Sequence, residues 1–477
     1  MGPTMPGLAA VVEGEAAARR RLTGFRQGLF DCLRRRADAL FELVDAVLTA
    51  RGPVASLVQL AGEAVFRRGH GALFDALACG DIDLEGLGGL LARSWEPADA
   101  GPVKIAVDVS PWPRPHAETS PERCNCYHAC RCRGTGRTVP GWPYSFAAGL
   151  DWGPSSWTAL LDTVRLGPDD DATTVTAAQV ARVTAALAAA GHLTGRPAPL
   201  FVFDAGYDPT RISWLTDQQG LDVQVLARVR SDRVYHAKPV QRPRHLGGRP
   251  RRYGARLALA DPATWPEPDT ATTSTSPRYG KVTVQAWHEH HQQLDRYRGW
   301  KHHTGELPVV PGTLIHIQVE RLPGNRTPKP MWLWHHAPEG TAFDLDLLWT
   351  AYLRRFDIEH TFKTIKQWLG WTCPQIRTPA QADRWTQLIL AAHTQLRLAR
   401  TLTTDLRHPW EKPPAPGRPL TPARVRRGFP RLQRHLGTPA SKPKPTHPGP
   451  GRPHGTTRPP RTRHPTGKTI NPTKKRS

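Results

Sequence analysis

Two aspartates, Asp108 and Asp204, each follow a short run of apolar residues. Asp108 lies in VKIAVDVS, and Asp204 lies in PLFVFDAGYD, where Gly206 leaves room for another group to approach closely. Such runs predict buried strands, and functional side chains of α/β sheets gather at strand ends. Carboxylate oxygens are the ligands that hard cations such as Mg²⁺ prefer. One aspartate in such a place is more often a cap or turn residue, but two on separate strands are less easily explained that way.

A second group of polar residues occupies the segment AYLRRFDIEHTFKTIKQWLGW at steps of three, four and seven: Tyr352, Arg355, Glu359 and Lys366. On an α-helix these steps place all four on one face. Leu348, Phe356 and Phe362 would then form the apolar stripe that packs on a sheet. Arg355 and Glu359 are also a favourable charge pair, so a solvated, salt-bridged surface helix is the alternative interpretation.

Together, Asp108, Asp204 with its D-A-G-Y run, and the spacing Y-x2-R-x3-E-x6-K resemble the insertion-sequence transposases of the DDE superfamily. The resemblance covers roughly residues 100 to 400. It implies a ribonuclease-H-like fold with a β-rich insertion between the second aspartate and the glutamate. It also implies an enzyme that cleaves and joins phosphodiester bonds at the ends of its own element, with double-stranded DNA as partner and substrate.

The chemistry of such a reaction explains the need for carboxylates. Attack on a phosphodiester requires an activated oxygen nucleophile, a stabilised leaving oxygen and neutralisation of charge at phosphorus, and two Mg²⁺ ions about 4 Å apart can supply all three. The resemblance implies that Asp108 bridges the two ions, for which Mn²⁺ can substitute, and that Asp204 and Glu359 each complete one of them. It places the remaining polar residues of the helix on DNA phosphates: Tyr352, Arg355 and Lys366.

Two further motifs have competing interpretations. In PMWLWHH, the resemblance implies that Trp332 stacks on a flipped DNA base, as an aromatic platform can, whereas tryptophans such as Trp332 and Trp334 are more often core residues. The run CNCYHACRC, with His116 and His128 nearby, could form a structural zinc site from four thiols: Cys124, Cys126, Cys130 and Cys132. Its C-x-C-x3-C-x-C spacing is not that of the usual zinc knuckles, and catalysis would not need it.

The elements expected around these residues describe an α/β fold. Three strand-like runs, VKIAVDVS, YSFAAGLDW and WTALLDTVRLG, precede a helix near 172–190; the strand PLFVFD, a short helix near 209–218 capped by Asp208, and the strand LDVQVLARVR follow. MWLWHH is a further buried strand, and two helices span 345–369 and 380–402. This order predicts a mixed sheet flanked by helices.

Composition divides the chain into five predicted parts. These are a helical DNA-binding domain (1–98), the first part of a ribonuclease-H-like catalytic domain (99–230), a β-rich insertion (231–330), the second part of the catalytic domain with the Glu359 helix (331–405), and a basic, Pro-rich, disordered tail (406–477). A helical packing or dimerisation domain is an equal alternative for the first part. The tail contains no Asp or Glu from Lys412 onward, so it is predicted not to bury a core.

The net charge of +24 over 477 residues favours a polyanionic partner, although basic ribosomal and membrane-surface proteins share this bias. No apolar run is long enough to span a bilayer and no signal peptide is apparent, so an intracellular protein with no membrane partner is expected. The richness in Ala, Arg, Pro and Gly indicates a high-GC bacterial source, and the expected location is the cytoplasm, in association with the nucleoid. Seven cysteines, four of them crowded together, argue against a disulfide framework. Because transposition joins two DNA ends, a homodimer on DNA is expected.

Three alternative functions remain open. The first is a transposase derivative that binds DNA without cutting it, although all the catalytic positions are intact. The second is a metal-dependent nuclease of the same fold, which would not require the long insertion or the Tyr/Arg/Lys helix. The third, a zinc-dependent DNA-packing protein, depends only on the charge and the cysteines.

Overall fold

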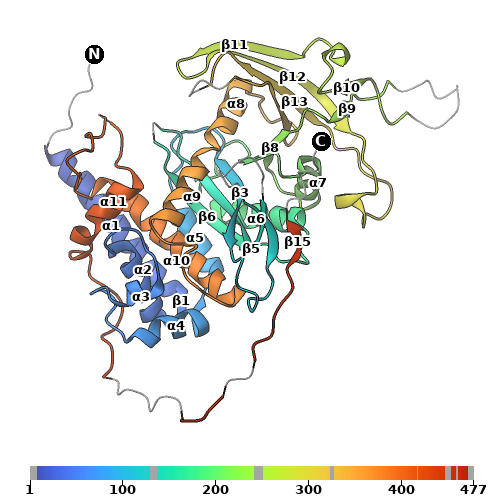
Figure 1. Cartoon of the computed structure of the whole chain (residues 1–477). Coiled ribbons are helices and arrows are strands. Elements are labelled where there is room, and N and C mark those ends of the chain that lie inside the picture. The colour runs from blue at the N-terminus through green and yellow to red at the C-terminus, as the bar shows by residue number, and fades with distance from the viewer. Residues whose placement is uncertain are drawn as a thin grey trace. The chain divides into compact units, whose positions relative to one another are not determined.

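The computed structural model describes residues 8–128, 137–153, 155–240, 251–322, 327–415, 417–445, 453–457 and 460–470. The chain forms two compact units (Figure 1). One unit contains the described residues up to Ala98, those within Val109–Asp169 and those within Asp357–Ile470; the other contains Asp99–Asp108 and Asp170–Phe356. Strands and helices alternate along the chain, which confirms the predicted mixed α/β class. Among the described helices, none has the length and apolar composition needed to cross a membrane.

The first unit is mainly helical. Its helices are α1 (Leu8–Cys32), α2 (Ala37–Thr49), α3 (Leu57–Ala61), α4 (His70–Cys79), α5 (Leu84–Arg93), α9 (Asp357–Gln367), α10 (Pro379–Leu398) and α11 (Pro422–Gln433), with the 3₁₀ turn η4 (Ala399–Thr401). The long helix α10 contacts α1, α2, α4 and α11. The helices predicted as a separate domain over 1–98 therefore share a core with helices from the C-terminal part of the chain.

The same unit contains an antiparallel sheet. Its strands are β4 (Cys124–His128), β5 (Arg137–Leu150) and β6 (Thr158–Arg165), with β15 (Gly467–Ile470) parallel to β4, and a small separate sheet pairs β1 (Leu33–Arg35) with β2 (Asp81–Ile82). The strand β3 (Lys104–Pro113) contributes its last five residues to this unit and its first five to the other.

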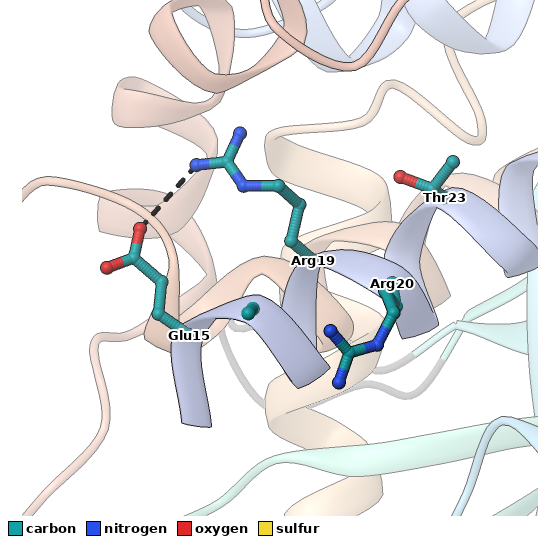
Figure 2. A pocket seen from close by; sticks show the side chains of 5 residues that line it. Glu15, Arg19, Arg20 and Thr23 are labelled. Atoms are coloured by element: carbon teal, nitrogen blue, oxygen red, sulfur yellow. Dashed lines mark ion pairs between the residues drawn. The ribbon is translucent and has the colours of Figure 1, made fainter. Parts of the chain in front are cut away.

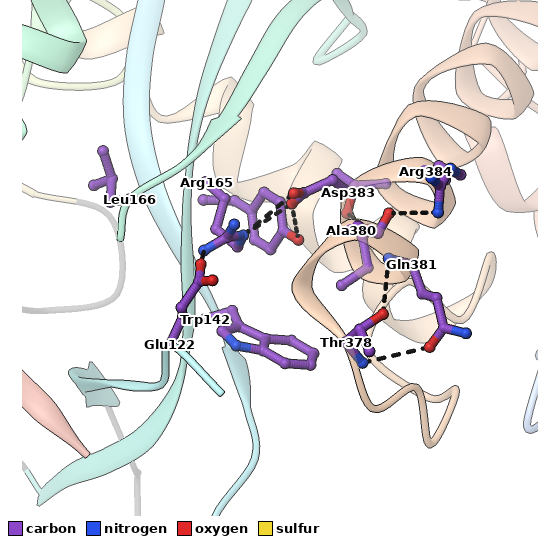
Figure 3. A network of polar contacts seen from close by, with 12 residues as sticks. Glu122, Trp142, Arg165, Leu166, Thr378, Ala380, Gln381, Asp383 and Arg384 are labelled. Carbon is purple, nitrogen blue, oxygen red and sulfur yellow. Dashed lines mark hydrogen bonds and ion pairs between the residues drawn. The ribbon is translucent and has the colours of Figure 1, made fainter. Parts of the chain in front are cut away.

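A partly buried polar network attaches the start of α10 to β5 and β6 (Figure 3). The Tyr144 hydroxyl donates to Asp383 at 2.7 Å, and Arg165 donates to the same carboxylate at 3.0 Å while pairing with Glu122 at 2.8 Å. Burial raises the pKa of Tyr144 well above its usual value, and the charge of Asp383 adds to this effect. The phenol therefore stays protonated and keeps donating to Asp383.

The expected disorder of residues 406–477 is wrong for α11. Val425 and Phe429 are fully buried, and Leu432 is nearly so. Their spacing of four and three residues gives the helix one apolar face, which contacts α2, α10 and η4. The prediction of disorder was based on the composition of the segment, which is dominated by arginine and proline. Composition does not reveal the short apolar period of this helix.

Arginines attach this C-terminal segment to the N-terminal helices. Arg426 donates to the carbonyls of Val47 and Gly52 near the end of α2, where a helix leaves its last carbonyls without intrahelical partners. Arg26, which is 2% exposed and paired with Asp45 at 2.6 Å, also donates to the carbonyl of Gly437 at 3.0 Å. The segment is thus part of the core of this unit.

The second unit contains a mixed sheet with helices packed on it. Its strands, besides β3, are β7 (Leu200–Phe203), β8 (Gln224–Val229), β9 (Val234–His236), β10 (Arg256–Ala258), β11 (Thr270–Ser276), β12 (Gly280–Gln292), β13 (Gly312–Val319) and β14 (Met331–His336). Its helices are α6 (Ala172–Ala189), α7 (Pro209–Gln218) and α8 (Leu345–Arg354), with the 3₁₀ turns η2 (Pro262–Thr264) and η3 (Arg298–Trp300). Strands β3, β7 and β8 are parallel, and β14, β13, β12 and β11 continue from β8 in antiparallel order (Figure 1). The predicted β-rich character of 231–330 is confirmed.

The buried position of Phe429 gives a direct test of the corrected C-terminal segment. We expect Phe429→Ala to lower the free energy of unfolding by about 3–5 kcal/mol, because it removes a large core side chain and leaves a cavity. The matched control Arg431→Ala changes an exposed residue of the same helix and should stay within about 0.5 kcal/mol of wild type. Urea unfolding followed by circular dichroism measures both, and equal stabilities would contradict the packing of α11.

Candidate active site

Three parallel strands lie side by side in the second unit: β3, β7 and β8. Val107 of β3 pairs with Phe203 of β7, and Phe203 pairs with Ala227 of β8. The residues that follow these three are Asp108, Asp204 and Arg228. Because neighbouring strands lie about 4.8 Å apart, this register places the three residues at neighbouring positions. The shared role of Asp108 and Asp204 in one metal site stays a prediction.

Local structure fixes the loop after Asp204. The Asp204 Oδ1 accepts a hydrogen bond from the Gly206 backbone N–H at 2.7 Å, which turns the chain immediately after β7. Asp208 then accepts from the Arg211 N–H at 3.1 Å and caps α7, as predicted. Burial raises the pKa of Asp208. Asp204 thus directly follows β7, whereas Asp208 is the N-cap of α7.

Helix α8 brings two of the predicted DNA-binding residues to the aspartates. This helix contacts β7 and β8. From its C-terminal end, Arg355 Nη1 donates to Asp108 Oδ2 at 3.0 Å, and the Arg355 guanidinium carbon lies 5.7 Å from the centre of the Tyr352 ring. Only 12% of the Asp108 side chain and 14% of the Arg355 side chain are exposed, so solvent screens this ion pair weakly.

The Tyr352 phenol lies among the charges of the site. Burial raises its pKa, and although the positive charges of Arg355 and Arg228 oppose this, the negative charge of Asp204 adds to it and the pKa remains raised. Arg228 also donates a hydrogen bond to this phenol. Tyr352 is therefore a neutral hydroxyl at physiological pH, with Asp204 and Arg228 as neighbours.

Arg228 is a site residue that sequence reasoning missed. It is exposed between the buried residues Ala227 and Val229. The sequence does contain a signal for Arg228. Strands β3, β7 and β8 begin at Lys104, Leu200 and Gln224. Counted from these starts, the fifth residues are Asp108, Asp204 and Arg228. Aligning the strand starts would have placed a cation beside the two carboxylates.

The predicted continuous helix over 345–369 is wrong. Helix α8 ends at Arg354 and α9 begins at Asp357. At the junction the Phe356 N–H donates to the Leu353 carbonyl, three residues back, so the helical ladder tightens and stops. Phe356 is 57% exposed and does not join the apolar stripe.

This break separates the four residues of the predicted stripe. Tyr352 and Arg355 belong to the second unit, with the two aspartates, whereas Glu359 and Lys366 lie on α9 in the first unit. Glu359 is exposed in the first turn of α9, where a negative charge is favourable for the helix dipole. The Lys366 ammonium lies 5.6 Å from the centre of the Trp371 ring, within cation–π range.

The stacking role of Trp332 is contradicted by its burial. Trp332 is 3% exposed, and its ring centre lies 4.9 Å from that of Trp265 and 5.3 Å from that of Trp287. Trp334 is fully buried in the same cluster. Both tryptophans are core residues of the sheet, because alternate positions of β14 are covered on both faces.

Carboxylates and thiols are the candidate metal ligands of the chain. Within the described parts of the chain, no group of three or more His, Cys, Asp or Glu side chains is arranged to hold a metal ion. Asp108 and Asp204 provide two neighbouring sets of hard carboxylate oxygens, which fit Mg²⁺ as part of a larger donor set. Cys124 and Cys126 are buried on β4, and burial raises the pKa of Cys126 to about 12, which favours the thiol over the thiolate that zinc binds. The other two thiols of the predicted zinc site, Cys130 and Cys132, lie outside the described residues.

Comparisons with known proteins identify the family of the chain. The sequence model of a family described as DDE superfamily endonuclease matches residues 28–294, a range that includes Asp108 and Asp204 and ends before Glu359. A solved structure described as the cryo-EM structure of the piggyBac transposase synaptic complex with hairpin DNA is 9% identical in sequence, with 85% of this chain and 73% of that chain covered and a TM-score of 0.40. No curated protein matches the chain. Because the family match spans more than half of its length, the chain belongs to the DDE superfamily endonucleases.

Proposed function

We propose that this protein is a DDE-type DNA transposase that cleaves and joins phosphodiester bonds at the ends of its own insertion element. The observation that carries the proposal is the pair Asp108 and Asp204 at adjacent parallel strand ends, with Arg355, Arg228 and Tyr352 around them. Two carboxylates beside two guanidiniums can hold cations and phosphate oxygens at one place. The family membership, established independently of this geometry, supports the same chemistry.

Asp108, Asp204 and Glu359 are the proposed ligands of two Mg²⁺ ions, with Mn²⁺ as a substitute. Bound metal would activate the attacking oxygen and neutralise charge on the scissile phosphate. Glu359 follows Arg355 by four residues, so the covalent chain alone keeps their Cα atoms within about 14 Å. Since Arg355 holds Asp108, this tether supports Glu359 as the third ligand.

The cations of the site have a second proposed role, in holding DNA. Arg355, Arg228 and Tyr352 offer hydrogen-bond donors beside the carboxylates, and Lys366 offers another from α9. Contacts of this kind to backbone phosphates position DNA without reading its sequence. The net charge of +24 supports double-stranded DNA as the partner. Because the reaction brings two element ends together, the active species is proposed to be a homodimer on DNA.

The catalytic proposal is tested with duplexes that carry the genomic sequences flanking the gene on each side, together with a supercoiled target plasmid. We expect Asp108→Asn, Asp204→Asn and Glu359→Gln each to reduce strand cleavage by on the order of 10²–10³-fold or more, because each replaces a charged carboxylate that would hold the metal ions with a neutral amide. EDTA should abolish cleavage, and Mg²⁺ or Mn²⁺ should restore it. Denaturing gels report cleavage, and joined plasmid products report strand transfer.

Asp357→Asn serves as the matched control for Glu359→Gln, since both acids lie in the first turn of α9. Full activity of Glu359→Gln with loss in Asp357→Asn would show that the third ligand is misassigned. Cleavage without joining by the wild type would indicate a nuclease of the same family. Sequence-dependent binding with no cleavage in any metal would indicate a non-catalytic derivative.

The Arg355–Asp108 ion pair predicts a competition between the protein's own cation and a metal. In the absence of DNA, we expect Arg355→Gln to bind Mn²⁺ roughly tenfold more tightly than wild type, because a hydrogen bond between charged groups is worth about 1.5–3 kcal/mol. Asp108→Asn should bind it more weakly. Electron paramagnetic resonance of free Mn²⁺ measures both affinities. The control Arg256→Gln alters an exposed arginine of β10 in the same unit; an equal gain there would attribute the effect to overall charge.

Arg228 gives an independent test of phosphate binding at the strand ends. We expect Arg228→Gln to weaken binding of the flanking-sequence duplex and to lower the salt dependence by about one released counterion, as loss of one phosphate contact does. Binding is measured by fluorescence anisotropy in EDTA, which prevents cleavage. Arg230→Gln, which removes an arginine paired with Asp232 at 3.0 Å two residues further on, is the control. If binding by wild type and by Arg228→Gln depended equally on salt concentration, Arg228 would not contact a DNA phosphate.

A further inference from the structure

A crevice of about 150 Å³ in the first unit is lined by three arginines. Arg21 comes from α1, Arg397 from the last turn of α10 and Arg400 from η4, with Glu96 and Thr401 at its sides. A water molecule takes up about 30 Å³ of the liquid, so a tetrahedral oxyanion such as a phosphate group has room here. The crevice is formed by residues outside the carboxylate site described above.

The guanidinium groups of the crevice exceed the carboxylates that face them. Asp151 accepts from Arg397 and Arg400 at 2.8 Å each, and Arg21 pairs with Glu96 at 3.1 Å. Three positive groups thus face two negative groups. Arg397 is 6% exposed, and its buried Nε has no hydrogen-bond partner among the residues that the structure describes. Burial lowers the pKa of Arg397, the charge of Asp151 opposes this, and the positive charges of Arg400 and Arg21 add to the lowering.

Stabilisation of the C-terminal end of α10 would account for only part of this arrangement. Cations near that end interact favourably with the helix dipole, which explains Arg397 and Arg400. The helix dipole does not explain Arg21, which comes from another helix. The Arg21 side chain is 45% exposed, and that of its partner Glu96 is 69% exposed. An exposed pair of this kind contributes little to stability, so the Arg21 guanidinium can exchange Glu96 for a stronger anion.

We propose that this crevice binds a backbone phosphate of DNA at a place other than the cleavage site, with Arg21 and Arg400 as the ligands, Thr401 as a further donor and Glu96 as the group that is displaced. Arg397, held by Asp151, orients Arg400 and supplies positive charge from beneath. The proposal rests on the proposed function only in taking DNA as the partner. It gives the helical part of the first unit a defined DNA contact.

The experiment measures binding of a fluorescein-labelled duplex of arbitrary sequence in EDTA over a range of salt concentrations. Arg21→Gln and Arg400→Gln should each weaken binding and lower the salt dependence by about one released counterion. Glu96→Gln should strengthen binding, because it removes the competing anion. Arg21→Gln and Glu96→Gln alter exposed side chains, so these two variants leave the buried Asp151 network intact; thermal unfolding checks all three for folding.

Two matched controls separate the crevice from overall charge. Arg20→Gln removes the neighbouring arginine of α1; Figure 2 shows Arg19 turned toward Glu15, with which it pairs at 3.5 Å, and Arg20 pointing away from that pair. Glu85→Gln removes an exposed acid of α5. We expect Arg21→Gln and Arg400→Gln to be non-additive, as residues that share one phosphate are, and Arg20→Gln and Arg400→Gln to be additive.

Isothermal titration with pyrophosphate, without DNA, completes the test. Weak binding that is lost in Arg400→Gln is the expected result, alongside the DNA effects. Pyrophosphate binding that depends on Arg400 while DNA binding is unchanged would show that the crevice takes a free phosphate and would overturn the proposal. DNA binding that is the same in all the variants would overturn it as well. If the crevice variants weaken DNA binding but wild type cleaves no DNA, the catalytic assignment fails and the crevice stands.

Discussion

The pairing of β3, β7 and β8 as parallel strands is the constraint on which the site depends. Their register puts Asp108 and Asp204 one strand apart. Neighbouring strands lie about 4.8 Å apart, and two negative charges at that separation would repel each other by about 3–4 kcal/mol at an effective dielectric constant of about 20. Something positive must offset this repulsion, and Arg355 and Arg228 are the cations that the fold provides. The sheet register therefore accounts both for the acidic pair and for the arginines around it.

This electrostatic requirement links stability to the proposed chemistry. The guanidinium of Arg355 pairs with an oxygen of Asp108 that a bound metal would also use. Arg355 is the C-cap of α8, where it keeps helical backbone angles and donates its N–H to the Ala351 carbonyl. Its side chain therefore continues the helical face that carries Tyr352, three residues earlier. The regular geometry of α8 up to its cap thus positions this cation beside Asp108.

Much of the site was predictable because strand ends can be read from local apolar runs. KIAV and LFVF are buried strand segments, and the register of β3 and β7 brings the aspartates that follow them to neighbouring positions. The helix break was not predictable, because three- and four-residue periodicity continues across Arg355 and Phe356 while the tightened turn depends on tertiary packing. Trp332 was misassigned because an aromatic residue in a strand has the same sequence signal whether its face is open or covered. The position of Glu359 relative to the aspartates stays a prediction from sequence.

The C-terminal segment shows a related limit, since Arg426 is a buried donor to the carbonyls of Val47 and Gly52 near the end of α2 and not part of a solvated charge run. The position of this segment near the end of the described chain also affects folding during synthesis. The contact from Arg26 to the Gly437 carbonyl joins residues 411 positions apart, so α1 emerges from the ribosome long before its buried guanidinium can find all its partners. Chains with such distant contacts fold slowly and expose unfinished surfaces meanwhile. A nascent or prematurely terminated chain would therefore leave the Arg26 guanidinium of the first unit short of its Gly437 partner until the C-terminal segment has been made.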